Sequence, residues 1–229
     1  MITIGIDEAG RGPILGPLVM AAVALEPRRA AKLTRAGVCD SKAFGAGPDA
    51  HAHRSELAER ILDCAEAFAI VVIDVAEVDR AVRHGCLNKL EQRNAEVMLR
   101  RLPPGDKIIA DGKKLFSPLR QRWPQLRAVD YAEQAHCSVA AASILAKVRR
   151  DELWHCIERR YRPDFGAIDG MGYVNAGTKR FLRAFIERLG GIPPEGRRSW
   201  PWDFASDLLP RGFDPLADVP DDQLSLFTS

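Results

Sequence analysis

Apolar residues along the chain fall into short runs and into longer stretches with helical spacing. Five of the short runs have the length and composition of β-strands buried on one or both faces. These predicted strands cover residues 1–7, 18–25, 68–75, 107–111 and 126–130. The first two are joined by the Gly- and Pro-rich segment 10–17, which predicts a tight connection.

Apolar residues three and four positions apart predict four helical regions. The first region begins near residue 55, and the second covers residues 78–101 with a break at Gly85. The third covers residues 138–160, and the fourth begins near Thr178, a candidate N-cap. Residues 39–53, which include His51 and His53, are expected to form a loop. Strands followed by strand–helix alternation indicate an α/β fold, with a mixed sheet flanked by helices and a C-terminal helical segment.

The net charge of +2 conceals an uneven distribution of charged residues. Residues 203–229 carry six Asp and one Arg, hence −5, which leaves +7 on the rest of the chain. A basic body with an acidic tail fits a protein that contacts a polyanion through its body. The Asp- and Pro-rich composition of residues 203–229 predicts a flexible tail.

The composition also excludes several classes of protein. The five Cys residues are scattered without a Cys-x-x-Cys pair, so we expect reduced thiols in a cytoplasmic protein, not a zinc site or disulfides. No apolar run has the length of a membrane span, and the N-terminus lacks the pattern of a signal peptide. The chain is long enough for one substantial domain or two small ones.

Acidic residues end three of the predicted strands, namely Asp7, Asp111 and Asp130, and Glu133 follows shortly after the last. In open α/β sheets the strand ends form the crevice that binds ligands. Carboxylates gathered there repel one another unless cations lie between them. Two Mg²⁺ ions about 3.5–4 Å apart can activate a water and stabilise the leaving oxygen of a phosphodiester. The pattern predicts metal-dependent phosphoryl chemistry, provided that the strands are neighbours.

Acids at strand ends also form turns, because their side chains cap the local backbone. For Asp130 alone, the two interpretations are equally open. The turn interpretation is weaker for Asp7 and Glu8, since a turn needs one acid and two adjacent charges beside a core strand cost stability.

The segment Gly10-Arg11-Gly12 follows the first two acids after one residue. The glycines let a ligand approach the backbone N–H groups closely, and successive amides in a turn form an anion-binding concavity. Arg11 adds a planar donor suited to phosphate. The segment predicts a cradle for one phosphodiester and its sugar, although taken alone it also fits a Gly-rich turn that binds nothing.

The segment "GIDEAGRGPILGPLVMAAVAL" closely resembles the opening motif of the ribonuclease HII family, and "AAASILAKVRRD" resembles a second motif. Shorter matches, "DSK", "DG", "GY" followed by "GTK", and "RRSW", occur in the family's order. The resemblance covers residues 1–202 and implies an RNase H-like catalytic domain there, followed by the tail at 203–229. It implies a bacterial endonuclease that uses Mg²⁺ or Mn²⁺ to cut RNA in RNA–DNA hybrids and at single ribonucleotides in duplex DNA.

By this resemblance, Asp7, Glu8 and Asp111 match three acids that are both catalytic and metal-binding. The fourth family acid is an Asp ten residues before the Ser of the "AAAS" helix, and Glu133 stands at that position. Asp130 is the alternative fourth ligand of the two divalent ions. The longer Glu side chain can ligate if the backbone shifts slightly.

The resemblance also implies substrate-binding residues. Gly10, Arg11 and Gly12 match the segment that contacts the ribose 2′-hydroxyl, the local group that distinguishes RNA from DNA. Tyr173 matches a tyrosine that stacks at the sugar of the RNA–DNA junction. Lys42 matches the lysine of the "DSK" loop and is expected near the active site or a phosphate.

The end of the chain, "DDQLSLFTS", resembles the short peptide with which bacterial replication and repair proteins bind the sliding clamp. Gln223, Leu224, Leu226 and Phe227 would be its contact residues, presented by an acidic leash that raises the local concentration of the nuclease on DNA. Packing of this apolar terminus against its own domain is the alternative.

The expected reaction is hydrolysis on the 5′ side of a ribonucleotide by a monomer, with 3′-hydroxyl and 5′-phosphate products. The sequence departs from the family pattern at Glu133, and around Tyr173 it has Met171 where Lys is common and Phe181 where His is common. These departures leave a second class open: a weakly active or inactive hybrid-binding protein tethered to the clamp. A cleavage assay with Mg²⁺ and then Mn²⁺ separates the two.

Overall fold

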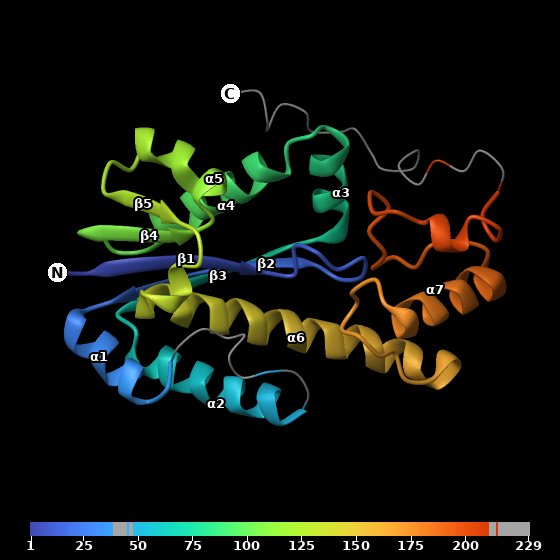
Figure 1. The fold of residues 1–229 in the computed structure, drawn as a ribbon, viewed down its shortest axis with the longest axis horizontal. Helices are drawn as coiled ribbons and strands as arrows, with labels where there is room; N and C mark the ends of the chain where they lie inside the picture. Colours follow the sequence, from blue (N-terminus) through green and yellow to red (C-terminus); the bar gives the residue numbers. More distant parts are fainter. Residues whose placement is uncertain (39–44, 46–47, 211–213, 215–229) are drawn as a thin grey trace. The chain divides into compact units, whose positions relative to one another are not determined.

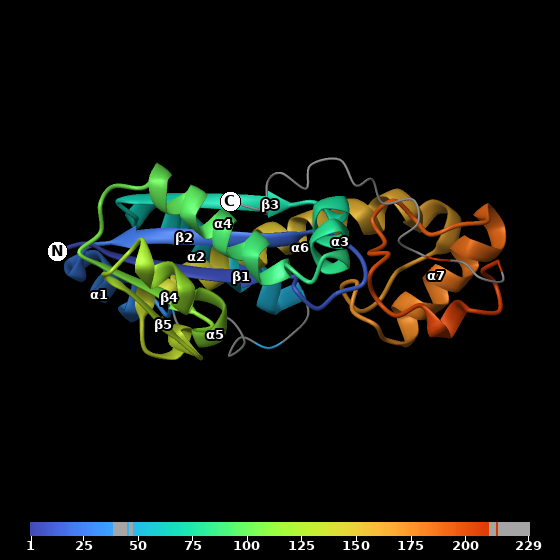
Figure 2. The same ribbon diagram turned by 90° about the horizontal axis from the view of Figure 1, so that it is seen from above.

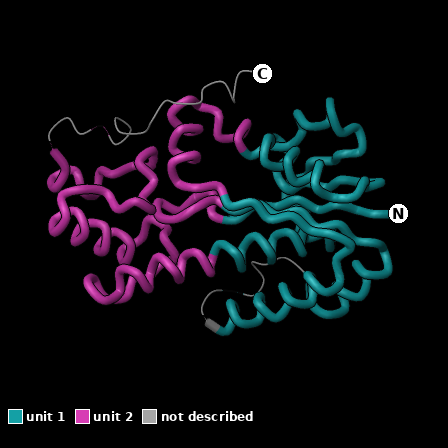
Figure 3. Tube along the Cα trace, turned by 180° about the vertical axis from the view of Figure 1, so that it is seen from behind, with its two compact units in different colours: residues 1–9, 19–72, 91–150 teal, residues 10–18, 73–90, 151–229 magenta. Residues whose placement is uncertain are grey.

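The computed structural model describes residues 1–38, 45, 48–210 and 214 (Figure 1). The chain forms two compact units, coloured separately in Figure 3. Unit 1 contains residues 1–9, 19–72 and 91–150, and unit 2 contains the remaining segments. The units alternate along the chain, and the predicted boundary between residues 202 and 203 lies inside unit 2.

Unit 1 is built around a five-stranded sheet with the strand order β3-β2-β1-β4-β5. The strands are β1 (Thr3–Ala9), β2 (Leu18–Leu25), β3 (Ala67–Ile73), β4 (Lys107–Asp111) and β5 (Leu126–Val129). β1 pairs antiparallel with β2 and parallel with β4, and β4 pairs parallel with β5, which confirms a mixed sheet. Because Ile6 pairs with Ala110 in parallel strands, the residues that follow this pair, Asp7 and Asp111, lie at the C-terminal ends of β1 and β4, at the same end of the sheet.

Helices cover both faces of this sheet (Figures 1 and 2). On one face lie α1 (Pro27–Arg35), α2 (Pro48–Cys64) and the start of α6 (Cys137–Phe165). On the other lie α5 (Lys113–Phe116) and the part of α4 (Leu87–Arg101) from Glu91 onward. All eight residues of β2 are buried, as expected for an uninterrupted apolar strand covered on both faces.

Gly5 lets α6 pack directly on β1. A Cβ atom at this position would lie 2.1 Å from the carbonyl carbon of Ser138. We expect Gly5→Ala to destabilise the protein by about 3 kcal/mol, the upper end of the usual cost of overpacking, because backbone atoms on both sides must move apart. Urea unfolding measures this loss.

Gly191→Ala is the matched control for that experiment, since a Cβ there meets no atom within 4 Å. Its stability is expected to change by less than about 0.5 kcal/mol. Equal stability of the two variants would contradict the close packing of α6 on β1.

Two helical segments of unit 1 differ from the sequence-based expectations. α1 was not predicted, because Leu33 is its only buried residue and no apolar periodicity marks it. α2 begins at Pro48, so the expectation that His51 and His53 lie in a loop was wrong. The polar first turns of α2 hide the helix, although Pro at a helix start is common.

Unit 2 contains α3 (Val75–Arg83) and α7 (Ala176–Leu189). The predicted break at Gly85 is confirmed, since Gly85 has φ +64° and separates α3 from α4. The N-cap of α7 is Asn175, not Thr178: Asn175 Oδ1 accepts a hydrogen bond from the Thr178 N–H at 3.0 Å. The Thr178 hydroxyl donates instead to the Asp169 carbonyl at 3.2 Å.

An aromatic cluster forms the core of unit 2 between the end of α6 and α7. Its rings, with centroids 5.2–6.3 Å apart, belong to Tyr161, Phe165, Phe181 and Phe185. Edge and tilted arrangements such as these add to the burial energy of the rings.

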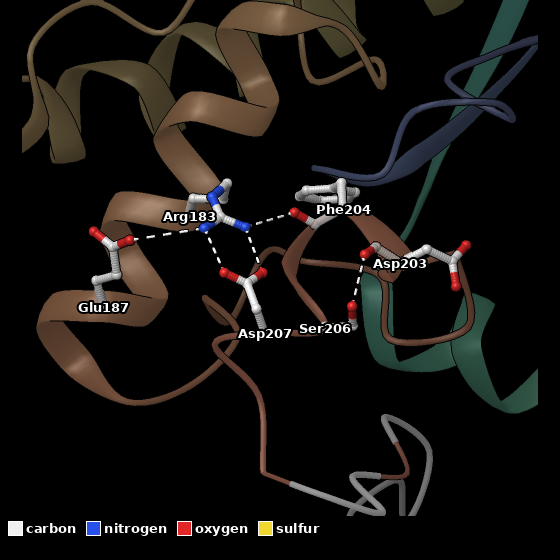
Figure 4. A network of polar contacts seen from close by, with 6 residues as sticks. All are labelled: Arg183, Glu187, Asp203, Phe204, Ser206 and Asp207. Carbon is white, nitrogen blue, oxygen red and sulfur yellow. Dashed lines mark hydrogen bonds and ion pairs between the residues drawn. The ribbon is translucent and has the colours of Figure 1, made fainter.

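The segment after this core packs on α7 through a polar network (Figure 4). Arg183 donates two hydrogen bonds to the Asp207 carboxylate, at 2.6 and 2.7 Å, and one to the Phe204 carbonyl at 2.8 Å. This bidentate contact raises the pKa of Arg183 and lowers the pKa of Asp207. The first residues of the predicted acidic tail are therefore ordered against α7. No helix in the described part of the chain is long and apolar enough to cross a membrane.

Candidate active site

Asp7 and Glu8 lie within β1, close to its C-terminal end at Ala9. Asp7 is only 6 % exposed, and Glu8 is half-buried. Asp7 Oδ1 accepts a hydrogen bond from the Glu8 backbone N–H at 2.8 Å. The Ser143 hydroxyl of α6 also hydrogen-bonds the Asp7 carboxyl. The close packing of α6 on Gly5 thus brings α6 to the acidic end of β1.

The surroundings of Asp7 disfavour its charged form. Burial raises the pKa of the Asp7 carboxyl well above its ordinary value, and the charges of Glu8 and, less strongly, Asp111 raise it further. The hydrogen bonds from Ser143 and from the Glu8 N–H lower the pKa in part. Because charge interactions weaken with distance, the effect of Asp111 indicates that it lies near Asp7.

Asp111 ends β4 and is linked to the segment that carries Glu133. Asp111 Oδ1 accepts a hydrogen bond from the Ala132 backbone N–H at 2.8 Å. Ala132 begins the short 3₁₀ helix η3 (Ala132–Gln134), so Glu133 is the next residue along. The Glu133 side chain is 3 % exposed.

Asp130 has a different environment from Glu133. It is exposed, and its Oδ1 accepts a hydrogen bond from the Lys113 backbone N–H in the first turn of α5, at 2.7 Å. This is the turn-forming role that acids at strand ends commonly take. The placement favours Glu133 as the fourth ligand, and the assignment stays a prediction.

The donor set of Asp7, Glu8, Asp111 and Glu133 fits a hard divalent cation, since Mg²⁺ and Mn²⁺ prefer carboxylate oxygens. Within the described residues, no three Asp, Glu, His or Cys side chains form a ready metal-binding group. The charges of Glu8 and Asp111 act on the Asp7 carboxyl, and Asp111 bonds the backbone N–H of Ala132, the residue before Glu133. Like charges repel at short range, so carboxylates gathered at one place favour the binding of a cation between them, and the assignment of these four residues as its ligands stays a prediction.

The Gly10-Arg11-Gly12 loop belongs to unit 2. Gly10 has φ +89°, a conformation that L-residues with side chains rarely adopt. The Arg11 guanidinium donates to Asn88 Oδ1 at 2.6 Å. Asn88 lies in the first turn of α4 and therefore orients the donor that the sequence assigned to phosphate.

Tyr173 lies beside this loop within unit 2. A Cβ on Gly12 would be 3.5 Å from Tyr173 Cε1, and Tyr173 is 47 % exposed. Gly172 makes the approach possible: its carbonyl accepts from the N–H groups of Ile14 and Leu15, at 2.9 and 3.2 Å. A Cβ on Gly172 would lie 2.6 Å from the Leu15 carbonyl oxygen, and its φ is +77°. Tyr173 and the loop therefore lie close together within unit 2, and their roles in substrate binding stay predictions.

The other predicted contact residues lie outside the described part of the chain. They are Lys42 in the "DSK" segment and the four residues of the terminal peptide, Gln223, Leu224, Leu226 and Phe227.

Sequence reasoning missed three residues that orient the candidate site. Ser143 was used only to count positions within the "AAAS" motif. Arg197, whose guanidinium donates to the Gly10 and Arg11 carbonyls, was used only as part of "RRSW". Asn88 carries no local signal, because a polar residue in a first helical turn is common.

Comparisons with known proteins agree with these features. A model of the Ribonuclease HII family matches residues 4–201. The ribonuclease HII of Thermococcus sibiricus is 35% identical over 206 residues, covering 86% of this chain and 87% of that protein. The ribonuclease HII of Geobacillus kaustophilus is 36% identical over 196 residues, covering 86% and 66%. Since the relatives include archaeal and bacterial proteins, a bacterial origin stays a prediction.

Solved structures show the same fold. The crystal structure of ribonuclease H2 from Pyrococcus horikoshii OT3 matches with a TM-score of 0.76 at 29% identity, covering 91% of this chain and 97% of that chain. The PCNA:RNase HII complex from Archaeoglobus fulgidus matches with a TM-score of 0.72 at 30% identity, covering 88% and 96%. The predicted RNase H-like fold is confirmed, and the chain belongs to the ribonuclease HII family, whose members are metal-dependent endonucleases that hydrolyse RNA in RNA–DNA hybrids.

Proposed function

We propose that this chain cuts RNA–DNA hybrids, and duplex DNA that contains single ribonucleotides, on the 5′ side of a ribonucleotide. Asp7, Glu8, Asp111 and Glu133 hold two divalent cations, Mg²⁺ or Mn²⁺. The observation that carries the proposal is the meeting of the β1 and β4 ends, where buried Asp7 lies near Asp111 and Asp111 is tied to the Glu133 segment.

Bound divalent cations would supply an activated water and neutralise charge on the leaving oxygen. The water oxygen bonds to phosphorus, and the bond from phosphorus to the 3′ oxygen of the preceding nucleotide breaks. That oxygen takes up a proton and becomes the 3′-hydroxyl, while the ribonucleotide keeps the 5′-phosphate. The four carboxylates fix the cations, and the Ser143 hydroxyl holds the Asp7 carboxyl in place.

Recognition of the ribonucleotide is assigned to unit 2. The amides of the Gly10–Gly12 loop bind the 2′-hydroxyl, Arg11 binds an adjacent phosphate, and Tyr173 stacks on the sugar at the junction. The support is the shared placement of the loop, Asn88 and exposed Tyr173. Only Ala9 separates Glu8 from Gly10 in the sequence.

The test is cleavage of three labelled duplexes: one with a single ribonucleotide, one with a long RNA strand, and one of DNA alone. We expect cutting of the first two with Mg²⁺ or Mn²⁺, none with a chelator, and none of the DNA duplex. Absence of product with both metals, together with tight hybrid binding, would favour the binding-protein alternative.

Tyr173→Ala is expected to lower kcat/KM on the single-ribonucleotide duplex about tenfold, the scale of one aromatic stacking contact. Tyr173→Phe keeps the ring and is expected to stay within about threefold of wild type. Steady-state kinetics of both variants make the comparison. Equal losses in the two variants would contradict stacking as the role of the ring.

Association with a sliding clamp is a further part of the proposal. The ribonuclease HII neighbour from Archaeoglobus fulgidus was solved as a complex with PCNA. Here the terminal peptide containing Gln223 and Phe227 is the proposed contact. Removal of residues 223–229 is expected to abolish clamp binding in a pull-down and leave clamp-free cleavage unchanged. Retained binding would move the contact elsewhere on the chain.

A further inference from the structure

We call the "RRSW" segment, residues 197–200, the 197–200 turn. Two of its side chains donate hydrogen bonds to all three carbonyl groups of the Gly10–Gly12 loop. Arg197 Nη2 donates to the Gly10 carbonyl, and Arg197 Nη1 donates to the Arg11 carbonyl at 2.9 Å. Trp200 Nε1 donates to the Gly12 carbonyl at 2.9 Å. All of these residues belong to unit 2.

These bonds fix the direction of the loop amides. In a trans peptide unit, the C=O and the following N–H point in opposite directions. The Gly10 carbonyl shares its unit with the Arg11 N–H, and the Arg11 carbonyl shares its unit with the Gly12 N–H. With both carbonyls turned toward Arg197, the two N–H groups point away from it. They form the concave donor pair that the proposed contact with a 2′-hydroxyl requires.

Arg197 is suited to this role because it is completely buried. Its Nε donates to the Gly16 carbonyl at 3.0 Å, so its planar fork bonds at three nitrogens, and the guanidinium lies 4.7 Å from the Trp200 ring centroid. A buried guanidinium is costly unless its donors find acceptors in good geometry. A lysine has one nitrogen and cannot reach carbonyls in three directions at once.

The 197–200 turn is itself fixed by α3. Asp79, which is 1 % exposed, accepts from the backbone N–H groups of Arg198 and Ser199, at 2.8 and 3.0 Å, and from the Ser199 hydroxyl. The Arg197 N–H donates to the Ile14 carbonyl at 2.8 Å. The turn is therefore a rigid support and not a loose loop.

We propose that Arg197 and Trp200 are positioning residues for ribonucleotide recognition, because they hold the Arg11 and Gly12 amides in the orientation that meets the ribose 2′-hydroxyl. This inference rests on the proposed function of the loop. It names the residues that give the loop its preference for a ribonucleotide over a deoxyribonucleotide.

The test is a binding measurement that does not depend on turnover. Full-length protein carrying Asp7→Asn, which is expected not to cut, is titrated against a duplex with one ribonucleotide and against the matched all-DNA duplex in Mg²⁺. The ratio of the two Kd values is the ribonucleotide preference. Arg197→Lys and Trp200→Phe are compared with Trp123→Phe, a control residue in unit 1, in the same background.

We expect Arg197→Lys and Trp200→Phe each to lower the preference about fivefold to tenfold, the scale of one net hydrogen bond. The Kd of both variants for the all-DNA duplex is expected to stay unchanged. Trp123→Phe is expected to keep the ribonucleotide preference of the parent protein. Destabilisation alone reduces the folded fraction and shifts both Kd values together, so it leaves the ratio intact. If Arg197→Lys does not fold, Trp200→Phe decides, since it removes the indole N–H and keeps a smaller aromatic ring at this position.

An unchanged preference in the folded variants would overturn the positioning role alone. A parent protein with no preference would overturn the proposed recognition of the 2′-hydroxyl as well. Cleavage by the wild-type protein tests the nuclease activity independently of the positioning role and of the 2′-hydroxyl recognition.

Discussion

Asp7→Asn is expected to lower cleavage of a duplex with one ribonucleotide by at least about 10²–10³-fold, the scale of removing one preorganised electrostatic group. Asn has nearly the shape of Asp and can still accept the hydrogen bond from the Glu8 N–H. What it lacks is the second anionic oxygen that a divalent cation needs. Single-turnover kinetics with Mg²⁺ and Mn²⁺ measure the loss.

The same substitution is expected to stabilise the metal-free protein. Asp7 is buried beside Glu8 and near Asp111, and these surroundings disfavour its charge. A neutral side chain of equal size relieves that cost. A gain of about 1 kcal/mol corresponds to a rise of about 2–4 °C in Tm for a chain of this size. Thermal unfolding in a chelating buffer gives the measurement.

Asp63→Asn is the control, because Asp63 is exposed on α2. It is expected to change neither rate nor Tm. Wild-type turnover by Asp7→Asn would refute the assignment of Asp7 as a metal ligand. A lower Tm of Asp7→Asn than of the wild type in the chelating buffer would show that the buried Asp7 carboxylate stabilises the fold, contrary to this prediction.

The strands were predictable because each is a short apolar run, and burial on both faces leaves a local signature in the sequence. The residues 18–25 coincide with β2. Helix α1 left no such signature, since only Leu33 on it is buried. Local periodicity reports what a segment buries, so a mostly exposed helix stays invisible to it.

The candidate acidic residues could be predicted from the sequence, but their proximity in the fold could not. That Asp7 and Asp111 lie at one edge depends on the parallel pairing of β1 with β4, two strands about a hundred residues apart in the sequence. The link from Asp111 to the Glu133 segment depends on one backbone N–H, that of Ala132. Neither contact has a residue-type signature.

The support of the Gly10–Gly12 loop was also hidden from the sequence. A charged residue such as Arg197 is expected at the surface, and its complete burial becomes understandable only when the loop carbonyls are seen around it. The glycines, in contrast, were informative, because Gly10 and Gly172 occupy positive φ and the chain approaches Gly172 closely.

Glu133→Gln is expected to lower cleavage by about 10²–10³-fold, whereas Asp130→Asn keeps activity within about threefold of wild type. The two acids are three residues apart, yet Glu133 is buried next to the residue that bonds Asp111, and Asp130 is exposed and bonds the Lys113 N–H. The amide of Asn can accept the same bond, so Asp130→Asn also retains the start of α5.

Glu133→Asp separates charge from reach. It restores the acid that the family resemblance implies at this position, shortened by one methylene, and we expect it to keep activity within about tenfold of wild type. An inactive Asp130→Asn beside an active Glu133→Gln would transfer the fourth ligand to Asp130. A metal ligand at residue 133 is expected to tolerate a change of length but not the loss of its charge. A small backbone shift of the short η3 segment can compensate for one methylene, whereas Gln lacks the anionic oxygen that a divalent cation prefers.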